Sequence, residues 1–360
     1  MAEKCDGQFL WVRLQADNLR RASNQLQLQR ALSKTPAGLE QLYEREWESI
    51  RTNPTVDTDR SLLLLKWAAF SIRPLSVSEI SVAVLIDNEL GLPVEELPDE
   101  DDGSYVASDI RDHCGSLIEI TKDDKNLDQM DSMTVNITHF SVKQFLLTHV
   151  FSCDGSLGLN TGLLVSHEER QHDFLAEKCL CYIFNIDIWE QNSLTKGGVN
   201  LQTSLLTYAA GTWDKHVCRA SKDNGDIMEL ANQFFQDETG AFDAWRRWTN
   251  RRFLGHDNSS ELDENDQQNR LSYSMALLLY STTEYLLSKD GCDVNGRGLF
   301  GETPLIISCR ENHVENVAQL LSLGANTSIS SVAGNVPLCI AVSKGHIEVV
   351  KLLLDKGADG

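Results

Sequence analysis

The C-terminal part of this 360-residue chain carries a sequence pattern that recurs after 33 positions. Each copy has proline near its start, glycine near its end, and aliphatic residues at helical spacing between them. Proline is tolerated at the first helical position and glycine adopts the left-handed conformation after the last, so each copy predicts a turn followed by two short antiparallel helices. One such unit cannot bury its apolar face alone, and successive units must therefore stack. The identical pairs are Gly301 and Gly334, Pro304 and Pro337, Leu305 and Leu338, Ile307 and Ile340, His313 and His346, Glu315 and Glu348, Val317 and Val350, Leu320 and Leu353, Leu321 and Leu354, Gly324 and Gly357, and Ala325 and Ala358.

This period resembles that of ankyrin repeats. A degenerate earlier unit ends in the segment 285–295, which is similar to the end of an ankyrin repeat with one residue inserted before Gly291. The second clear unit has Val336 where the first has Thr303, so part of the usual hydrogen bonding of the turns is expected to be missing. The resemblance implies an exposed surface that binds a protein partner, without a pocket for chemistry.

Composition excludes several classes of partner. The chain has 32 basic against 53 acidic residues, a net charge of −21, so electrostatic attraction to nucleic acid or to an anionic membrane is not expected. Its nine cysteines are scattered without a CxxC pair, which indicates reduced thiols inside the cell. The N-terminus lacks the pattern of a signal peptide, and no stretch is apolar for long enough to span a membrane. We expect a cytoplasmic protein, a nuclear one, or one found in both compartments.

Apolar periodicity predicts helices through most of the region before residue 90. A helix starting at Thr35 carries an apolar stripe as far as Ile50. The almost wholly apolar helix 61–72 must stop before Pro74, because proline disfavours helical geometry in the residue that precedes it. Ser76 and Glu79 then form a capping-box pattern that opens a helix over 80–86.

Two strands are expected after the acidic loop 95–103. Apolar and polar residues alternate from Met133 to Thr138, and this segment is predicted to pair with 117–121. Ser141 and Gln144 give a second capping-box pattern, for a helix over 142–150. Three helices, a two-stranded wing and a further helix follow the order of a winged-helix-like unit. Between residues 56 and 150 there are seven basic and eighteen acidic residues, so direct DNA binding is not expected and internal packing is favoured.

The predicted fold class is mainly α, with a helical and winged-helix-like region followed by a short ankyrin solenoid. An acidic, polar linker over 257–269 separates the repeats from a helical region rich in tryptophan and tyrosine. The predicted domains are a helical arm (1–52), a winged-helix-like domain (56–150), a helical linker domain (160–256) and ankyrin repeats (270–360), the last made of a degenerate repeat 271–297 and repeats 298–330 and 331–360.

A series of short motifs resembles the region that follows the nucleotide-binding domain in fungal NACHT–ankyrin proteins of the STAND signalling class. The resemblance implies that residues 1–52 correspond to the end of a NACHT module. No GxxxxGK[ST] phosphate-binding loop occurs in the sequence, so we expect a fragment or a degenerate member of that class that is not itself the nucleotide switch. The motifs are at 9–12, 39–43, 67–70, 73–75, 114–117 and 139–146, with Tyr208–Ala210 and Trp213–His216 matching the helical segment before the repeats.

Other candidate sites are better interpreted as structural. His139 has no identifiable nucleophile and supporting acid, so no catalytic residue is predicted. Cys179 and Cys181, with His167 and His172, match no zinc-binding spacing. The arginines 246, 247, 251 and 252 around Trp245 and Trp248 are expected to pair with nearby acids, although such a cluster suits an acidic partner or RNA as well. No catalytic residue, cofactor or metal is therefore predicted.

The sequence predicts a non-enzymatic intracellular adaptor that binds a protein partner through its ankyrin repeats, with no direct contact to nucleic acid or membrane. An ankyrin-type transcriptional co-regulator that reaches DNA through another protein is the alternative, and a nucleotide hydrolase would need a phosphate loop from another chain. His313 and His346 are expected to be architectural. The candidate partner-binding residues lie at turn tips and at the ends of first helices: Leu299, Phe300, Arg310, Glu311, Val332, Ala333, Ser343 and Lys344.

Overall fold

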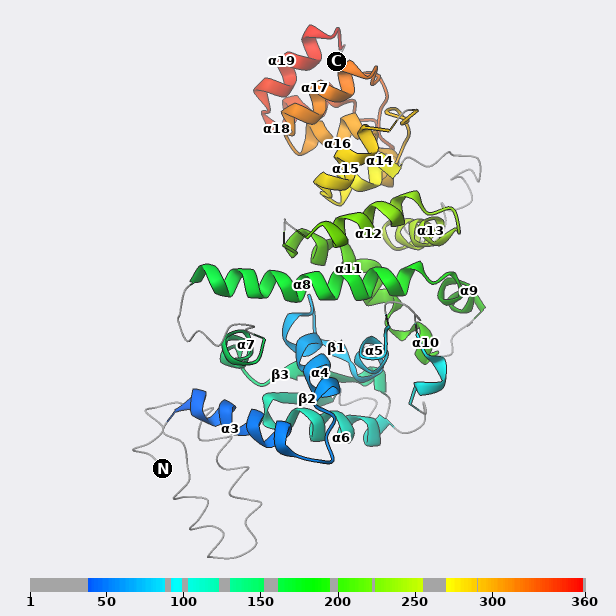
Figure 1. Ribbon diagram of the computed structural model, residues 1–360. Coiled ribbons are helices and arrows are strands. Elements are labelled where there is room, and N and C mark those ends of the chain that lie inside the picture. The colour runs from blue at the N-terminus through cyan, green and yellow to red at the C-terminus, as the bar shows by residue number, and fades with distance from the viewer. Residues whose placement is uncertain are drawn as a thin grey trace, which may run out of the picture. The chain divides into compact units, whose positions relative to one another are not determined.

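The computed structural model describes residues 38–87, 92–98, 103–122, 130–151, 161–194, 200–221, 224–254, 270–289 and 291–358 (Figure 1). The expected N-terminal arm before residue 38 and the acidic linker 257–269 lie outside these residues. The fold is mainly helical, as predicted. It divides into two compact units, one made of residues 1–182 and 191–209 and the other of 183–190 and 210–360. The division into four domains stays a prediction.

The first unit has a small antiparallel sheet among its helices. Its strand order is β1-β3-β2, so the last strand in sequence lies in the middle. The helices and strands that the two units share or that belong to the first are α3 Leu39–Thr52, α4 Thr58–Phe70, β1 Leu75–Ser76, α5 Val77–Ala83, α6 Gly103–Cys114, β2 Ile118–Lys122, β3 Met133–Ile137, α7 Phe140–Phe145, a π-helical turn Leu146–Val150, α8 Thr161–Phe184, α9 Ile186–Leu194, α10 Leu201–Ser204 and α11 Leu206–Arg219, with 3-10 turns at Val94–Glu96, Gly115–Leu117 and Met130–Ser132.

The expected pairing of two strands is confirmed, with β2 and β3 antiparallel and Ile120 opposite Val135. The strand β1 was not predicted from the sequence. It has only Leu75 and Ser76, with Leu75 opposite Val135, and two residues are too few for any alternation to be visible. Val135 and Leu75 are both buried, which places the centre of the sheet against the helices of this unit.

The helix α4 is apolar around most of its circumference because neighbours cover it on several sides. It packs against α3, α5, α6 and β3, and Leu64, Leu65 and Trp67 are fully buried. It ends at Phe70, before Pro74 as predicted. The predicted capping box is also confirmed: the Glu79 amide donates to Ser76 Oγ at 3.1 Å, and Glu79 Oε2 accepts from the Ser76 amide at 2.9 Å.

The second predicted capping box is wrong. The helix α7 begins at Phe140, and its N-cap is His139, whose side chain accepts a hydrogen bond from the Ser141 amide. The Ser141 hydroxyl cannot cap a helix of its own, because it lies 2.8 Å from His139 Nδ1 and 2.9 Å from the Tyr43 hydroxyl. The helix also changes to π-helical geometry after Phe145.

An aromatic core fills the helical part of the second unit. Trp213 is fully buried, with its ring centroid 5.4 Å from that of Phe234 and 5.8 Å from that of Trp245. The Trp245 indole donates to the Ala210 carbonyl at 2.9 Å, so its single polar atom is satisfied. Besides the part of α11 that belongs to it, this unit contains α12 Gly225–Gln236, α13 Ala241–Leu254, α14 Arg270–Ala276, α15 Tyr280–Leu287, α16 Pro304–Arg310, α17 Val314–Ser322, α18 Pro337–Lys344 and α19 Ile347–Asp355.

The last six helices form three stacked hairpins, drawn from yellow to red in Figure 1. The first helices α14, α16 and α18 pack in a row, and among the second helices α17 packs against α19. The helix α15 of the first hairpin packs against α12. Gly324 and Gly357 have φ angles of +87° and +77°, which confirms the predicted left-handed glycine after each second helix.

The replacement of Val336 by threonine is expected to stabilise the last hairpin by about 1 kcal/mol. Thr303 caps α16 by accepting a hydrogen bond from the Ile306 amide at 3.3 Å, whereas Val336, in a similar extended conformation, provides no side-chain cap for α18. Chemical denaturation followed by circular dichroism measures the gain. The matched variant Thr303→Val should lose a similar amount, and equal midpoints for Val336→Thr and the native chain would contradict the prediction.

Candidate protein-binding face of the repeats

Two tight turns precede the first helices α16 and α18, and we call them finger 1 (298–301) and finger 2 (331–334). Finger 1 is closed by hydrogen bonds from the Gly298 amide to the Glu302 carbonyl at 2.8 Å and from the Gly301 amide to the Gly298 carbonyl at 3.0 Å. Finger 2 repeats both bonds at the equivalent positions, from Ser331 to Asn335 and from Gly334 to Ser331. The 33-residue period therefore reproduces the main-chain geometry of the turn.

The two fingers are joined to each other through the main chain. The Val332 amide donates to the Phe300 carbonyl at 3.2 Å. Arg297 adds a second link, because its Nη1 donates to the Gly301 carbonyl at 3.1 Å and to the Ser330 carbonyl at 2.7 Å. A Cβ atom on Gly301 would lie 2.7 Å from Val332 Cγ2, and the φ angle of Gly301 is +65°, so this position requires glycine. The spacing of the fingers is thus fixed by contacts that leave the tips uncovered.

Apolar side chains are exposed at both tips. Val332 is 80% exposed, and Phe300 and Ala333 are exposed as well. Phe300 also has a φ angle of +60°, which is uncommon for a residue with a side chain and marks a constrained turn. The structure therefore brings these three predicted residues together. The side chain of Leu299, the fourth predicted tip residue, lies outside the described residues.

The other predicted residues lie at the C-terminal ends of α16 and α18. Arg310 is half-buried, with Nη1 2.6 Å from Glu302 Oε1 and Nε 2.8 Å from Glu311 Oε1. Because Glu302 closes finger 1, this ion pair connects the base of the finger to the first helix of its unit. Ser343 and Lys344 are exposed at the end of α18. The part played by each in recognition stays a prediction.

Sequence reasoning missed Arg297 and Gly301, which hold the fingers in register, and Val342, which is exposed on α18. The recurrence of Gly301 as Gly334 was the available signal for the glycine. No sequence pattern pointed to Arg297. Its partner, the Ser330 carbonyl, belongs to the next repeat, so the contact can be recognised only from the three-dimensional stack.

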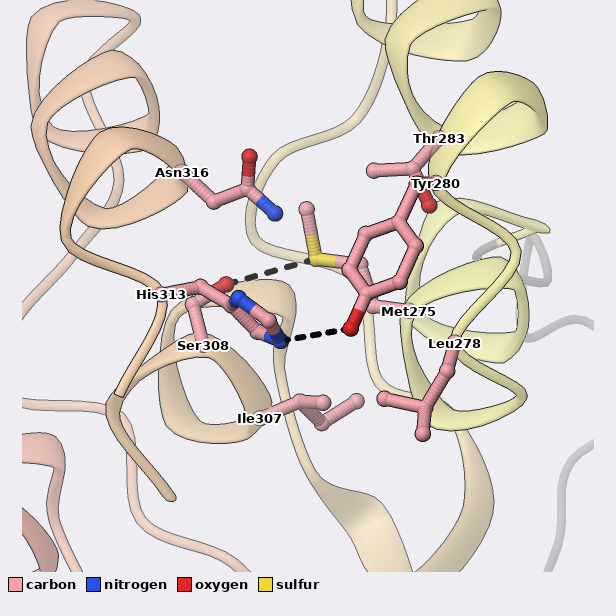
Figure 2. A pocket seen from close by; sticks show the side chains of 8 residues that line it. All are labelled: Met275, Leu278, Tyr280, Thr283, Ile307, Ser308, His313 and Asn316. Carbon is pink, nitrogen blue, oxygen red and sulfur yellow. Dashed lines mark hydrogen bonds between the residues drawn. The ribbon is translucent and has the colours of Figure 1, made fainter. Parts of the chain in front are cut away.

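His313 and His346 connect each unit to the one before it. His346 Nε2 lies 3.2 Å from the Arg310 carbonyl, and His313 Nε2 lies 3.4 Å from the Tyr280 hydroxyl. Figure 2 shows Tyr280 and His313 pointing toward each other beside a cavity of about 10 Å³, which has room for roughly one water molecule. The space between the first and second hairpins therefore suits a bridging water and is too small for a substrate.

The remaining candidates have structural surroundings. His139 caps α7 and lies against Phe140, with ring centroids 4.3 Å apart. In the part of the chain that the structure describes, no three His, Cys, Asp or Glu side chains are grouped so that they could hold a metal ion. Arg246 Nε lies 3.9 Å from Asp243 Oδ1, and the Arg252 guanidinium lies 5.3 Å from the centroid of the Trp248 ring.

The cysteines of the described part form no disulfide with one another. Burial, together with the nearby Asp109 carboxylate, raises the pKa of the Cys114 thiol, and burial raises the pKa of Cys309 to about 12. These two thiols therefore stay protonated and behave as small apolar side chains. Among the helices that the structure describes, none combines the length and the apolar character needed to cross a membrane.

Comparison with known proteins supports the interpretation of the hairpins. A family model for ankyrin repeats, in three copies, matches residues 274–360. The chain is also 29% identical over 230 residues to the azaphilone pigments biosynthesis cluster protein L of Monascus ruber, an alignment that covers 63% of this chain and 44% of the relative. The chain thus spans less than half the length of that relative. The C-terminal part of the chain consists of ankyrin repeats, a module for protein–protein interaction.

Proposed function

We propose that this chain is a non-enzymatic, intracellular adaptor that binds a protein partner through fingers 1 and 2 and the neighbouring ends of α16 and α18. One observation carries the proposal: the main-chain bond between Val332 and Phe300 holds two exposed apolar tips at a fixed spacing. Prearranged apolar side chains at the centre of a contact are the usual source of binding energy in protein interfaces.

The charges around the tips favour a protein partner over a nucleic acid. Arg310, at the base of finger 1, already pairs with Glu302 and Glu311, so it offers little attraction to phosphate. The net charge of −21 also disfavours the approach of a nucleic acid, because it repels phosphate at long range. A partner surface with an apolar centre and a polar rim would complement the tips and the adjoining charged residues.

We propose further that the chain derives from a NACHT–ankyrin protein of the STAND class. The first unit supports this, because α4, β1, α5, α6, β2 and β3 follow one another in that order and the sheet order is β1-β3-β2, an arrangement consistent with a winged-helix unit. The match to the Monascus ruber protein is longer than the ankyrin region, so the similarity extends into the part before the repeats. In this proposal the first unit and the helices before the repeats act as the scaffold.

Replacing both Phe300 and Val332 with serine is expected to weaken binding of the partner by about tenfold or more, because apolar anchors at the centre of an interface typically contribute more than 1 kcal/mol each. The partner is first identified by pull-down with the native chain, and its affinity for purified variants is then measured by calorimetry. The control is Ile347→Ser, since Ile347 is 70% exposed on the second helix α19, outside the fingers.

Two outcomes would contradict the adaptor proposal. Deletion of residues 270–360 could leave every partner bound, in which case the repeats are not the binding surface. The control variant could weaken binding as much as the double variant, in which case the fingers have no special role. Unchanged folding of each variant is checked by circular dichroism.

The co-regulator alternative is supported by the name of the Monascus ruber relative, which connects that protein with a pigment biosynthesis cluster. In this alternative the same fingers bind a DNA-binding protein, and the chain is found in the nucleus. Microscopy of the tagged chain in its own organism tests the alternative, and exclusion from the nucleus would contradict it.

A further inference from the structure

Two lysines of the first unit share one phenylalanine ring. The Lys66 Nζ on α4 lies 4.0 Å from the centroid of the Phe174 ring on α8 and 5.6 Å from that of Phe151. The Lys178 Nζ lies 5.5 Å from the centroid of the same Phe174 ring. Lys66 and both rings are half-buried, so solvent reaches the amine from only part of its surroundings. The Lys66 side chain therefore ends in apolar surroundings beside a second positive charge.

Lys66 differs from the neighbouring lysines in that its charge is not compensated. Lys143 on α7 is also half-buried and lies over a phenylalanine ring, but its Nζ is 2.5 Å from Glu168 Oε1. The Lys178 Nζ donates to the Ile86 carbonyl at 2.6 Å. Among the residues that the structure describes, none offers Lys66 a carboxylate or a hydrogen-bond acceptor. Lys143 is thus a matched reference for Lys66, with the ring contact present and the charge paired.

The surroundings of Lys66 favour its uncharged amine. Taking an ammonium out of water costs more than a phenylalanine ring returns, since tryptophan is the aromatic side chain that binds cations best. Burial and the charge of Lys178 accordingly lower the pKa of Lys66. Only the neutral amine has an electron pair to share, and a lysine in apolar surroundings next to another cation reacts readily with carbonyl groups.

From this geometry we propose that Lys66 is a covalent binding site for an apolar aldehyde, held as a reversible imine. The electron pair of Nζ forms a bond to the carbonyl carbon. The carbonyl oxygen then leaves as water with the two amine protons while the C=N double bond forms, so no oxidant or reductant is needed. The rings of Phe174 and Phe151 favour an apolar or aromatic substituent on the aldehyde, because they can pack against it. This small-molecule site in the first unit goes beyond the proposed adaptor, whose fingers belong to the second unit.

Reductive trapping with benzaldehyde tests the proposal on the full chain near neutral pH. Cyanoborohydride converts the imine to a stable secondary amine, and peptide mapping by mass spectrometry gives the labelling rate of each lysine. We expect Lys66 to be labelled about tenfold or more faster than Lys143, because a pKa lower by one gives about tenfold more neutral amine. The ratio of the two rates should be lower with glyoxylate, a charged aldehyde that the rings do not favour.

Three variants separate the contributions to this rate. Lys178→Met should slow the labelling of Lys66 about threefold or more, because it removes the second positive charge and keeps most of the side chain. Lys143→Met removes a lysine whose charge is already paired, so it should leave the Lys66 rate unchanged. Lys66→Arg keeps the positive charge and should abolish the fast-labelled position. Circular dichroism checks that each variant is folded.

Three results would overturn the inference. Equal labelling of Lys66 and Lys143 by benzaldehyde would show that Lys66 is an ordinary lysine. A Lys66 rate that is the same in the Lys178→Met variant and the native chain would show that the second charge does not activate the amine. Equal ratios for benzaldehyde and glyoxylate would show that the rings select no apolar ligand. None of these results depends on whether fingers 1 and 2 bind the partner of the proposed adaptor.

Discussion

Replacing Trp213 with alanine is expected to lower the free energy of unfolding of the second unit by about 3–5 kcal/mol, the usual cost of truncating a large buried aromatic residue. Trp213 is fully buried, and its ring contacts those of Phe234, Phe235 and Trp245. Its removal would leave a cavity that these rings cannot fill without leaving their own contacts. Urea denaturation followed by circular dichroism measures the loss.

Trp248 gives a matched control on the neighbouring helix α13. Its side chain is only half-buried and lies beside the exposed Arg252, so the Trp248→Ala variant should lose markedly less stability than Trp213→Ala. Equal losses for the two variants would contradict the assignment of Trp213 to the centre of the core. A chain with the Trp213 substitution that remains as stable as the native chain would contradict it as well.

Replacing Asp214 with asparagine is expected to stabilise the chain at pH 7 to 8 by up to about 3 kcal/mol. Burial raises the pKa of this carboxyl from 3.8 to about 6, and a difference of about two in pKa corresponds to ~3 kcal/mol. The folded state therefore holds the Asp214 proton more tightly than the unfolded state does. Below pH 4 both states are protonated and no cost remains, whereas above pH 6 the folded chain contains a poorly hydrated charge.

The measurement is the difference in unfolding free energy between Asp214→Asn and the native chain at several pH values. The difference should be near zero below pH 4, rise between pH 4 and 6, and stay constant above. Asp237→Asn provides a control of opposite sign. Burial raises the pKa of Asp237, but hydrogen bonds from Thr239, Ala241 and Phe242 outweigh burial and the pKa is lowered, so this carboxylate stabilises the fold above about pH 4. A pH-independent effect of Asp214→Asn would contradict the prediction.

The sequence was most informative where one local rule decided the outcome. The repeated prolines and glycines predicted the starts and ends of the last hairpins, because few other residues suit those backbone positions. The Ser76 capping box was predicted for the same reason, since both of its partners lie within four residues. At α7 the same rule failed, because the Ser141 hydroxyl is shared between His139 and Tyr43, and Tyr43 is distant in sequence.

In the candidate binding face, too, the features that depend on a local rule could be predicted, and those that depend on contacts between hairpins could not. The exposure of Phe300 and Val332 followed from their position in the period, since a turn between hairpins cannot be buried by its own unit. The bonds that align the fingers could not be predicted, because they join atoms of consecutive units and depend on how closely these approach. The half-burial of Arg310 was missed for a related reason: its partner Glu302 precedes the helix and reaches it only when finger 1 is closed.

The bond between the Val332 amide and the Phe300 carbonyl uses no side-chain atoms. Substitutions at these two positions can therefore change the chemistry that the tips present while the distance between them is preserved, provided that Gly301 is retained. In the proposed adaptor, a change of target therefore requires substitutions only at the exposed tips, and the positive φ angle of Phe300 limits which residues suit that position. In such a scaffold the tip side chains would determine which target binds, whereas Gly301 and the main-chain bond would keep the tips in position.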